Sequence, residues 1–288
     1  MSRFHRMYSI ILLVLALSSR FNPCVALFET WNNINNWCPD AKCENTGNCR
    51  PCERKWLFVI AQGRSGSTTM KNMINLLPGV RLNGETGDVL STLRELYSYI
   101  DTDENIRKGN NHMNGPWGHN EYNNELSCAA QKFIEALNPP ADNETKNNPS
   151  DILGFKEIRV NSLEKVKFLI SHFPCSRFIF NIRSDEEALA KSQKHAFRGG
   201  ETMLDNHAIP RLYSIVQQML GDKRVYAMDM IQWNDETVGV EYFNDLAVWL
   251  GFEHCAFPRV LRDNVIVQWR WTTDENRFEL DPSCRYVG

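Results

Sequence analysis

Short apolar runs of strand length alternate with segments of helical periodicity along most of this 288-residue chain. The expected strands are residues 56–62, 80–82, 152–158, 177–182 and 225–228. The expected helices begin after Thr68 and continue with residues 89–100, 163–173, 186–197 and 240–250, the last ended by Gly251 as a C-cap. Strands that alternate with helices indicate an α/β fold of three layers, with a central parallel sheet flanked by helices. Ligands of such sheets bind beyond the carboxyl ends of the strands, so we expect the chemistry just after each apolar run.

The composition narrows the classes of protein to which the chain can belong. A hydrophobic fraction of 42% excludes a disordered polymer. The net charge of −3, without a polybasic run, argues against a protein built to hold nucleic acid. Residues 101–124 are polar and rich in Asn and Gly, which predicts a loop that could act as a lid.

The first 26 residues have the pattern of a secretory signal peptide. Two arginines precede an apolar run at residues 7–17, and small residues end the segment at Ala26. The alternative is an uncleaved membrane anchor, but Arg20 interrupts the stretch before it reaches the roughly 20 apolar residues that span a bilayer. We therefore expect a protein of the secretory pathway, in the Golgi lumen or secreted, with a membrane partner only if this segment stays as an anchor.

Cysteines support an oxidising compartment. Cleavage after residue 26 removes Cys24 and leaves eight cysteines, with 29 basic against 35 acidic residues and thus a net charge of −6. Four of the eight crowd into fifteen residues: Cys38, Cys43, Cys49 and Cys52. A disulfide-rich N-terminal segment at residues 27–54 is predicted over a zinc site, because the first pair is spaced C-x4-C and a partner half is missing.

The later cysteines are far apart, and the sequence does not pair them. A Cys255–Cys284 bond would tie down the C-terminal tail, while Cys128 and Cys175 stay unassigned. An Asn143-Glu144-Thr145 sequon in a Pro- and Asn-rich stretch predicts a glycoprotein.

A loop between the first strand and its helix has the composition of an anion site. Its sequence is Gly63-Arg64-Ser65-Gly66-Ser67-Thr68-Thr69, so backbone N–H groups and a helix N-terminus point at one spot. The alternative is a simple Gly/Ser turn. The lysine of the ATP-type loop G-x-x-x-x-G-K-[ST] is missing, which disfavours a nucleotide kinase.

Strand, GRSGST and helix together resemble the 5′-phosphosulfate loop of the sulfotransferases, which use 3′-phosphoadenosine 5′-phosphosulfate (PAPS) as sulfuryl donor. FIFNIRSDEEALAKSQ at residues 178–193 is similar to the 3′-phosphate motif of that family, and GFKEIR at 154–159 and LAVWLGF at 246–252 are similar to two further segments. The resemblance covers most of residues 56–252, and it implies a P-loop-like fold and a PAPS donor without a metal.

The resemblance also implies roles for individual residues. The 5′-phosphosulfate would be held by Arg64, Ser65, Gly66, Ser67, Thr68 and Thr69. Arg183 and Ser192 would grip the 3′-phosphate, because an arginine forks onto phosphate oxygens. They are nine residues apart rather than the usual eight, so Ser184 is an alternative to Ser192. Arg64, which stands where cytosolic members carry lysine, would also stabilise charge on the phosphosulfate bridge.

A catalytic base is expected after the second strand. Glu85 follows Asn83-Gly84 there, and several luminal sulfotransferases place a catalytic glutamate in a similar position; a helix-start glutamate is the alternative. Rival bases in the polar loop are His112, His119 and Glu121, of which His119 is also a candidate for contacting the acceptor.

Other residues could orient the donor or the acceptor. Lys156 and Arg159 at the end of the third strand are such candidates, although a structural ion pair is an equal alternative. Trp117 and Trp233 could stack on a sugar or on adenine, but tryptophans are more often packed in a core.

The sequence thus predicts a sulfotransferase-like α/β domain at residues 55–288. We expect a luminal enzyme that sulfates a hydroxyl of a glycan, a protein or a secreted small molecule. The alternative is a secreted module that binds a sulfated or phosphorylated ligand without turnover.

Overall fold

The computed structural model describes residues 37–38, 50–102, 122–138, 151–196, 205, 207–235, 238–260, 280 and 283–287. The expected signal peptide, most of the cysteine-rich segment, residues 103–121 with His119, and the Asn143 sequon lie outside these ranges. The expectations for them stay predictions.

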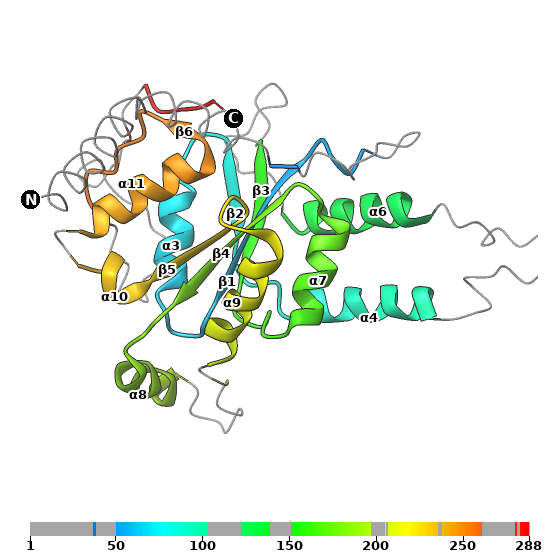
Figure 1. The fold of residues 1–288 in the computed structure, drawn as a ribbon, viewed down its shortest axis with the longest axis horizontal. Helices are drawn as coiled ribbons and strands as arrows, with labels where there is room; N and C mark the ends of the chain where they lie inside the picture. The colour runs from blue at the N-terminus through cyan, green and yellow to red at the C-terminus, as the bar shows by residue number, and fades with distance from the viewer. Residues whose placement is uncertain are drawn as a thin grey trace, which may run out of the picture.

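A five-stranded parallel sheet forms the centre of the domain (Figure 1). Its strands are β1 (Lys55–Ala61), β2 (Val80–Asn83), β3 (Ile152–Glu157), β4 (Ser176–Ile182) and β5 (Val225–Asp229). They lie in the order β2-β3-β1-β4-β5, so β1 has β3 on one side and β4 on the other. The chain runs from β1 to β2 on one side, and the connection from β3 crosses β1 to reach β4 on the other side. The carboxyl end of β1 is therefore a switch point, where ligands bind in α/β sheets.

Helices cover both faces of this sheet. One face carries α3 (Ser67–Ile74), α10 (Met230–Trp233) and α11 (Gly239–Leu250), and the other carries α4 (Val89–Thr102), α6 (Tyr122–Ala136), α7 (Leu163–His172) and α9 (Ala208–Leu220). Alternate residues of β1 supply the two cores: Leu57 and Val59 pack beneath α3, while Trp56, Phe58 and Ile60 pack on the opposite face. α8 (Glu186–Ala196) lies beyond the carboxyl end of β4 (Figure 1). The three-layer prediction is confirmed.

Among the described residues, three helices were not predicted: α6, α9 and α10. α4 runs to Thr102 and α6 starts at Tyr122, so both ends of the expected loop at 101–124 are helical. α9 was missed although Pro210 stands in its first turn, a position at which a helix tolerates proline. The Gly251 C-cap is confirmed, with a left-handed φ of 95°.

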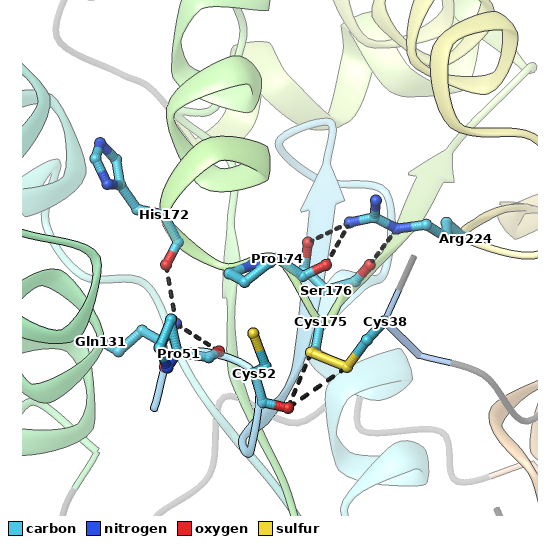
Figure 2. The surroundings of a disulfide bond; sticks show 9 residues. All are labelled: Cys38, Pro51, Cys52, Gln131, His172, Pro174, Cys175, Ser176 and Arg224. Carbon is cyan, nitrogen blue, oxygen red and sulfur yellow. Dashed lines mark hydrogen bonds between the residues drawn. A yellow bond between two sulfur atoms is a disulfide. The ribbon is translucent and has the colours of Figure 1, made fainter. Parts of the chain in front are cut away.

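A disulfide bond attaches Cys38 of the cysteine-rich segment to the amino end of the sheet (Figure 2). Cys38 is bonded to Cys175, the residue before β4. Cys52 and Cys128 are also disulfide-bonded, which a zinc site at Cys38 and Cys52 would not allow. The Gln131 side-chain amide donates hydrogen bonds to the Pro51 carbonyl (3.0 Å) and the His172 carbonyl (2.9 Å), which joins this segment to α6 and α7.

A disulfide bond that the sequence left open attaches the C-terminal tail. Cys255 is bonded to Cys284, beside the antiparallel pair β6 (Phe252–Glu253) and β7 (Arg285–Tyr286). Across the described ranges, no helix is long and apolar enough to cross a membrane.

Candidate active site

The loop at residues 63–69 leaves the central strand β1 and runs into α3. Gly66 starts that helix with a left-handed φ of 74°. A Cβ atom added to Gly66 would lie 2.7 Å from Cη2 of Trp233. Both the backbone conformation and the close indole therefore require glycine here.

Buried polar groups support this loop from below. The Asn181 amide donates to the Ser65 carbonyl (2.9 Å) and to Ser65 Oγ (3.0 Å), and Trp233 Nε1 donates to Asn181 Oδ1 (3.2 Å). Ser65 Oγ in turn donates to the Gln62 carbonyl (2.7 Å). Trp233 is only 2% exposed, so it packs in the core and does not offer its ring to a ligand.

Two arginines and a serine from three elements meet at the loop. Arg64 Nε donates to Ser192 Oγ of α8 (3.2 Å), and Arg183 Nη1 donates to the Arg64 carbonyl (3.2 Å). Ser184 is exposed, and its backbone N–H donates to Asp229 Oδ1 at the start of α10 (3.2 Å). The structure thus brings Ser192, rather than the Ser184 side chain, into contact with the loop arginine.

The remaining loop residues differ in their exposure. Ser67 is buried, Thr69 is half-buried and Thr68 is exposed. The first turn of α3 holds no acidic side chain, which leaves the positive end of the helix dipole unopposed. Together with Arg64 and Arg183, this end of the molecule suits an anionic ligand.

Arg64 adopts a left-handed φ of 70°, which costs a residue with a Cβ about 1–2 kcal/mol. We expect Arg64→Gly to raise the free energy of unfolding by roughly 0.5–1 kcal/mol, after the added chain entropy of glycine is subtracted. Arg64→Ala is the matched control, because it removes the same charge and keeps the strain. Urea denaturation compares the two, and equal stabilities would contradict the strain argument.

A second group of charges gathers where β2 and β3 end. Glu85 Oε1 lies 2.6 Å from Lys156 Nζ, and Glu85 Oε2 lies 3.2 Å from Arg159 Nη1. Lys156 is 5% exposed, whereas the Glu85 side chain keeps 34% of its surface in solvent. The register pairs Lys156 with Val59 of β1, which packs beneath α3, so strand alternation turns this lysine toward the face of the sheet that carries the loop.

The connection after Glu85 is held at Asp88 as well. Lys165 Nζ lies 3.2 Å from Asp88 Oδ1 and donates to the Arg159 carbonyl (2.7 Å). Burial alone would raise the pKa of Asp88, but hydrogen bonds from Ser91 and Lys165 outweigh it and hold the pKa below its ordinary value.

Sequence reasoning missed the supporting residues Asn181, Gln62 and Gln193. Arg183 N–H donates to Gln62 Oε1 (2.6 Å), and Gln193 Nε2 donates to the Gly63 carbonyl (3.2 Å). The available signal was a polar residue at the end of an apolar run, as in FIFNI for Asn181. In the part of the chain that the structure describes, no group of three or more His, Cys, Asp or Glu side chains could hold a metal ion.

Comparison with solved structures finds sulfotransferases of low sequence identity. The sulfotransferase domain of the Synechococcus PCC 7002 olefin synthase is 15% identical, with 74% of this chain and 75% of that chain covered and a TM-score of 0.45. A sulfotransferase from Alicyclobacillus acidocaldarius is 12% identical, with 69% and 81% covered and a TM-score of 0.39. Sulfotransferase STF9 from Mycobacterium avium is 13% identical, with a TM-score of 0.35; 68% of this chain is covered, but only 64% of that longer protein.

No curated relative matches the sequence. A family model described as the sulfotransferase family matches residues 57–244, which is more than half of the chain and includes the loop at 63–69, Glu85 and Arg183. The chain therefore belongs to the sulfotransferase family and is an enzyme that transfers sulfuryl groups.

Proposed function

We propose that this enzyme transfers a sulfuryl group from PAPS to a hydroxyl of a glycan, a protein or a secreted small molecule. One observation carries the proposal: the Glu85 carboxylate, held 2.6 Å from Lys156 Nζ, lies at the same edge of the sheet as the loop that carries Arg64. A base and an anion-binding loop on one edge are what sulfuryl transfer to a hydroxyl requires.

The residues at the loop fit this donor. Gly66 lets the backbone turn over Trp233, Arg64 carries a positive charge at the start of the loop, and Arg183 and Ser192 stand on the elements that follow β4. We propose that residues 64–69 hold the 5′-phosphosulfate and that Arg183 and Ser192 hold the 3′-phosphate. When bound, the donor supplies an activated sulfuryl group on a phosphate leaving group.

On the acceptor side, Glu85 would take the proton of the attacking hydroxyl on one of its carboxylate oxygens. Lys156 and Arg159 fix that carboxylate through both oxygens and so orient it. Arg64 would balance the negative charge that the phosphate leaving group takes up when the sulfuryl group passes to the acceptor oxygen.

The expected signal peptide and the disulfide-bonded Cys38–Cys175 and Cys255–Cys284 pairs support a place in the secretory pathway, because such bonds persist in oxidising compartments. We therefore propose an acceptor from the Golgi lumen or the extracellular space. Glycosylation at Asn143 belongs to the same proposal.

Calorimetric titration with 3′,5′-adenosine bisphosphate tests the donor site. The wild-type protein is expected to bind, and Arg183→Ala to lose about 10- to 100-fold in affinity, the range for a hydrogen bond to a charged group. Adenosine 5′-monophosphate is the matched ligand, since it lacks the 3′-phosphate and should bind both proteins with nearly equal affinity. Wild-type affinity of Arg183→Ala for the bisphosphate would refute the site.

The same titration separates the two candidate serines. We expect Ser192→Ala to weaken bisphosphate binding by several-fold, because Ser192 Oγ lies beside Arg64. Ser184→Ala removes an equivalent hydroxyl from an exposed position and should bind as the wild type does. The reverse order of affinities would assign the 3′-phosphate contact to Ser184.

A further inference from the structure

Glu157, the last residue of β3, is a carboxylate with only 1% of its surface exposed. Each of its oxygens accepts hydrogen bonds from a different segment. Oε1 accepts from the backbone N–H groups of Ile158 (2.9 Å) and Arg159 (3.2 Å). Oε2 accepts from Thr86, both from its N–H (2.9 Å) and from its Oγ1 hydroxyl (3.0 Å). A buried carboxylate without hydrogen-bond partners is very unfavourable. Loss of the contact between Glu157 and Thr86 would therefore cost much free energy.

The contact joins the same two segments as the Glu85–Lys156 ion pair. Thr86 directly follows Glu85, and Glu157 directly follows Lys156. Side chains of neighbouring strand residues point to opposite faces of the sheet. The two contacts therefore hold the connection after β2 from opposite faces of the sheet.

We infer that Glu157 is a positioning residue, which fixes Thr86 and thereby holds the Glu85 carboxylate against Lys156. The inference rests on the proposed function only for the role of Glu85 as the base. The second attachment, between Lys165 and Asp88, does not replace it, because it acts three residues away and Asp88 is 46% exposed. Glu157, by contrast, accepts a hydrogen bond from the backbone N–H of Thr86, the residue directly after the base.

Glu157→Gln tests the inference with little change in shape. The glutamine amide has only one acceptor oxygen, so it can accept hydrogen bonds from Thr86 or from the N–H groups of the turn after β3, but not from both. On the other side its NH₂ group faces N–H donors. We expect the Thr86 amide to exchange its hydrogen roughly tenfold faster, measured by mass spectrometry with fragmentation to single residues. Transfer of radiolabelled sulfate from PAPS should fall about 10- to 100-fold through a misplaced base, with unchanged affinity for 3′,5′-adenosine bisphosphate.

Three variants serve as controls. Glu187→Gln makes the same chemical change at an exposed glutamate of α8 and should alter neither exchange nor transfer. Glu85→Gln should stop transfer but keep the Thr86 amide protected. Thr86→Val removes the hydroxyl contact with Glu157 and keeps the N–H hydrogen bond, so the rate of transfer should fall by a few-fold. In the double variant with Glu157→Gln, the rate of transfer should fall by much less than the two single effects multiplied together.

If the Thr86 amide of Glu157→Gln exchanges its hydrogen at the wild-type rate, the inference is overturned. Faster exchange without a loss of transfer would overturn it as well. If Glu157→Gln does not fold, Thr86→Val decides, and wild-type transfer in that variant overturns the inference. Failure of the proposed function gives different results. If Glu85 is not the base, Glu85→Gln retains transfer, whatever the exchange rate at Thr86; if the protein is not a PAPS-dependent enzyme, the wild type itself transfers no label.

Discussion

Replacing Glu85 with glutamine is expected to lower the rate of sulfuryl transfer by about 10²- to 10⁴-fold, the contribution of a general base. Glutamine cannot take the proton of the acceptor hydroxyl, yet its amide oxygen still accepts a hydrogen bond from Lys156, which is now 2.6 Å from the carboxylate. Affinity for 3′,5′-adenosine bisphosphate should stay close to that of the wild type. Single-turnover assays with radiolabelled PAPS measure the first quantity, and calorimetry measures the second.

The control for this change is Glu187→Gln, an exposed glutamate that should retain full activity. Retention of transfer by Glu85→Gln, with the donor still bound, would show that the base is elsewhere. His112, His119 and Glu121, which lie outside the described residues, would then be the next side chains to replace.

Gly66→Ala is expected to destabilise the protein by about 2–4 kcal/mol and to abolish measurable donor binding. Part of the cost is the left-handed φ of 74°, which is worth about 1–2 kcal/mol for alanine. The rest is overpacking, because the new Cβ would lie 2.7 Å from Trp233 Cη2, and that ring is fixed by its hydrogen bond to Asn181. Thermal or urea unfolding gives the stability, and calorimetry gives the donor affinity.

Gly87→Ala separates the two contributions. Gly87 has a similar φ of 66°, but an added Cβ would meet nothing within 4 Å. It should therefore cost about 1–2 kcal/mol at most. Equal destabilisation by Gly66→Ala and Gly87→Ala would mean that Trp233 does not constrain the loop.

The sheet and the anion loop could be predicted from the sequence because their signals are local. The central strand β1 contains the continuous apolar run WLFVIA, and the glycine, serine and arginine residues of the loop follow this run after Gln62.

What could not be predicted depends on contacts between distant segments. Asn181 supports Ser65 from 116 residues away, and Glu157 binds Thr86 from 71 residues away. The Cys38–Cys175 bond spans 137 residues. In each case the sequence shows a polar or sulfur side chain of a suitable kind, but only the order β2-β3-β1-β4 determines which segments become neighbours.

We propose that this enzyme moves a sulfuryl group from PAPS to a hydroxyl, with Glu85 as the base. The most direct measurement incubates the wild-type and Glu85→Gln proteins with ³⁵S-labelled PAPS and a panel of glycans, peptides with tyrosine and secreted small molecules. We expect the wild type, but not Glu85→Gln, to transfer label to a member of the panel, while both proteins bind 3′,5′-adenosine bisphosphate. Bisphosphate binding by the wild type without transfer to any acceptor would instead indicate a binding module, and equal transfer by both proteins would contradict the assignment of Glu85.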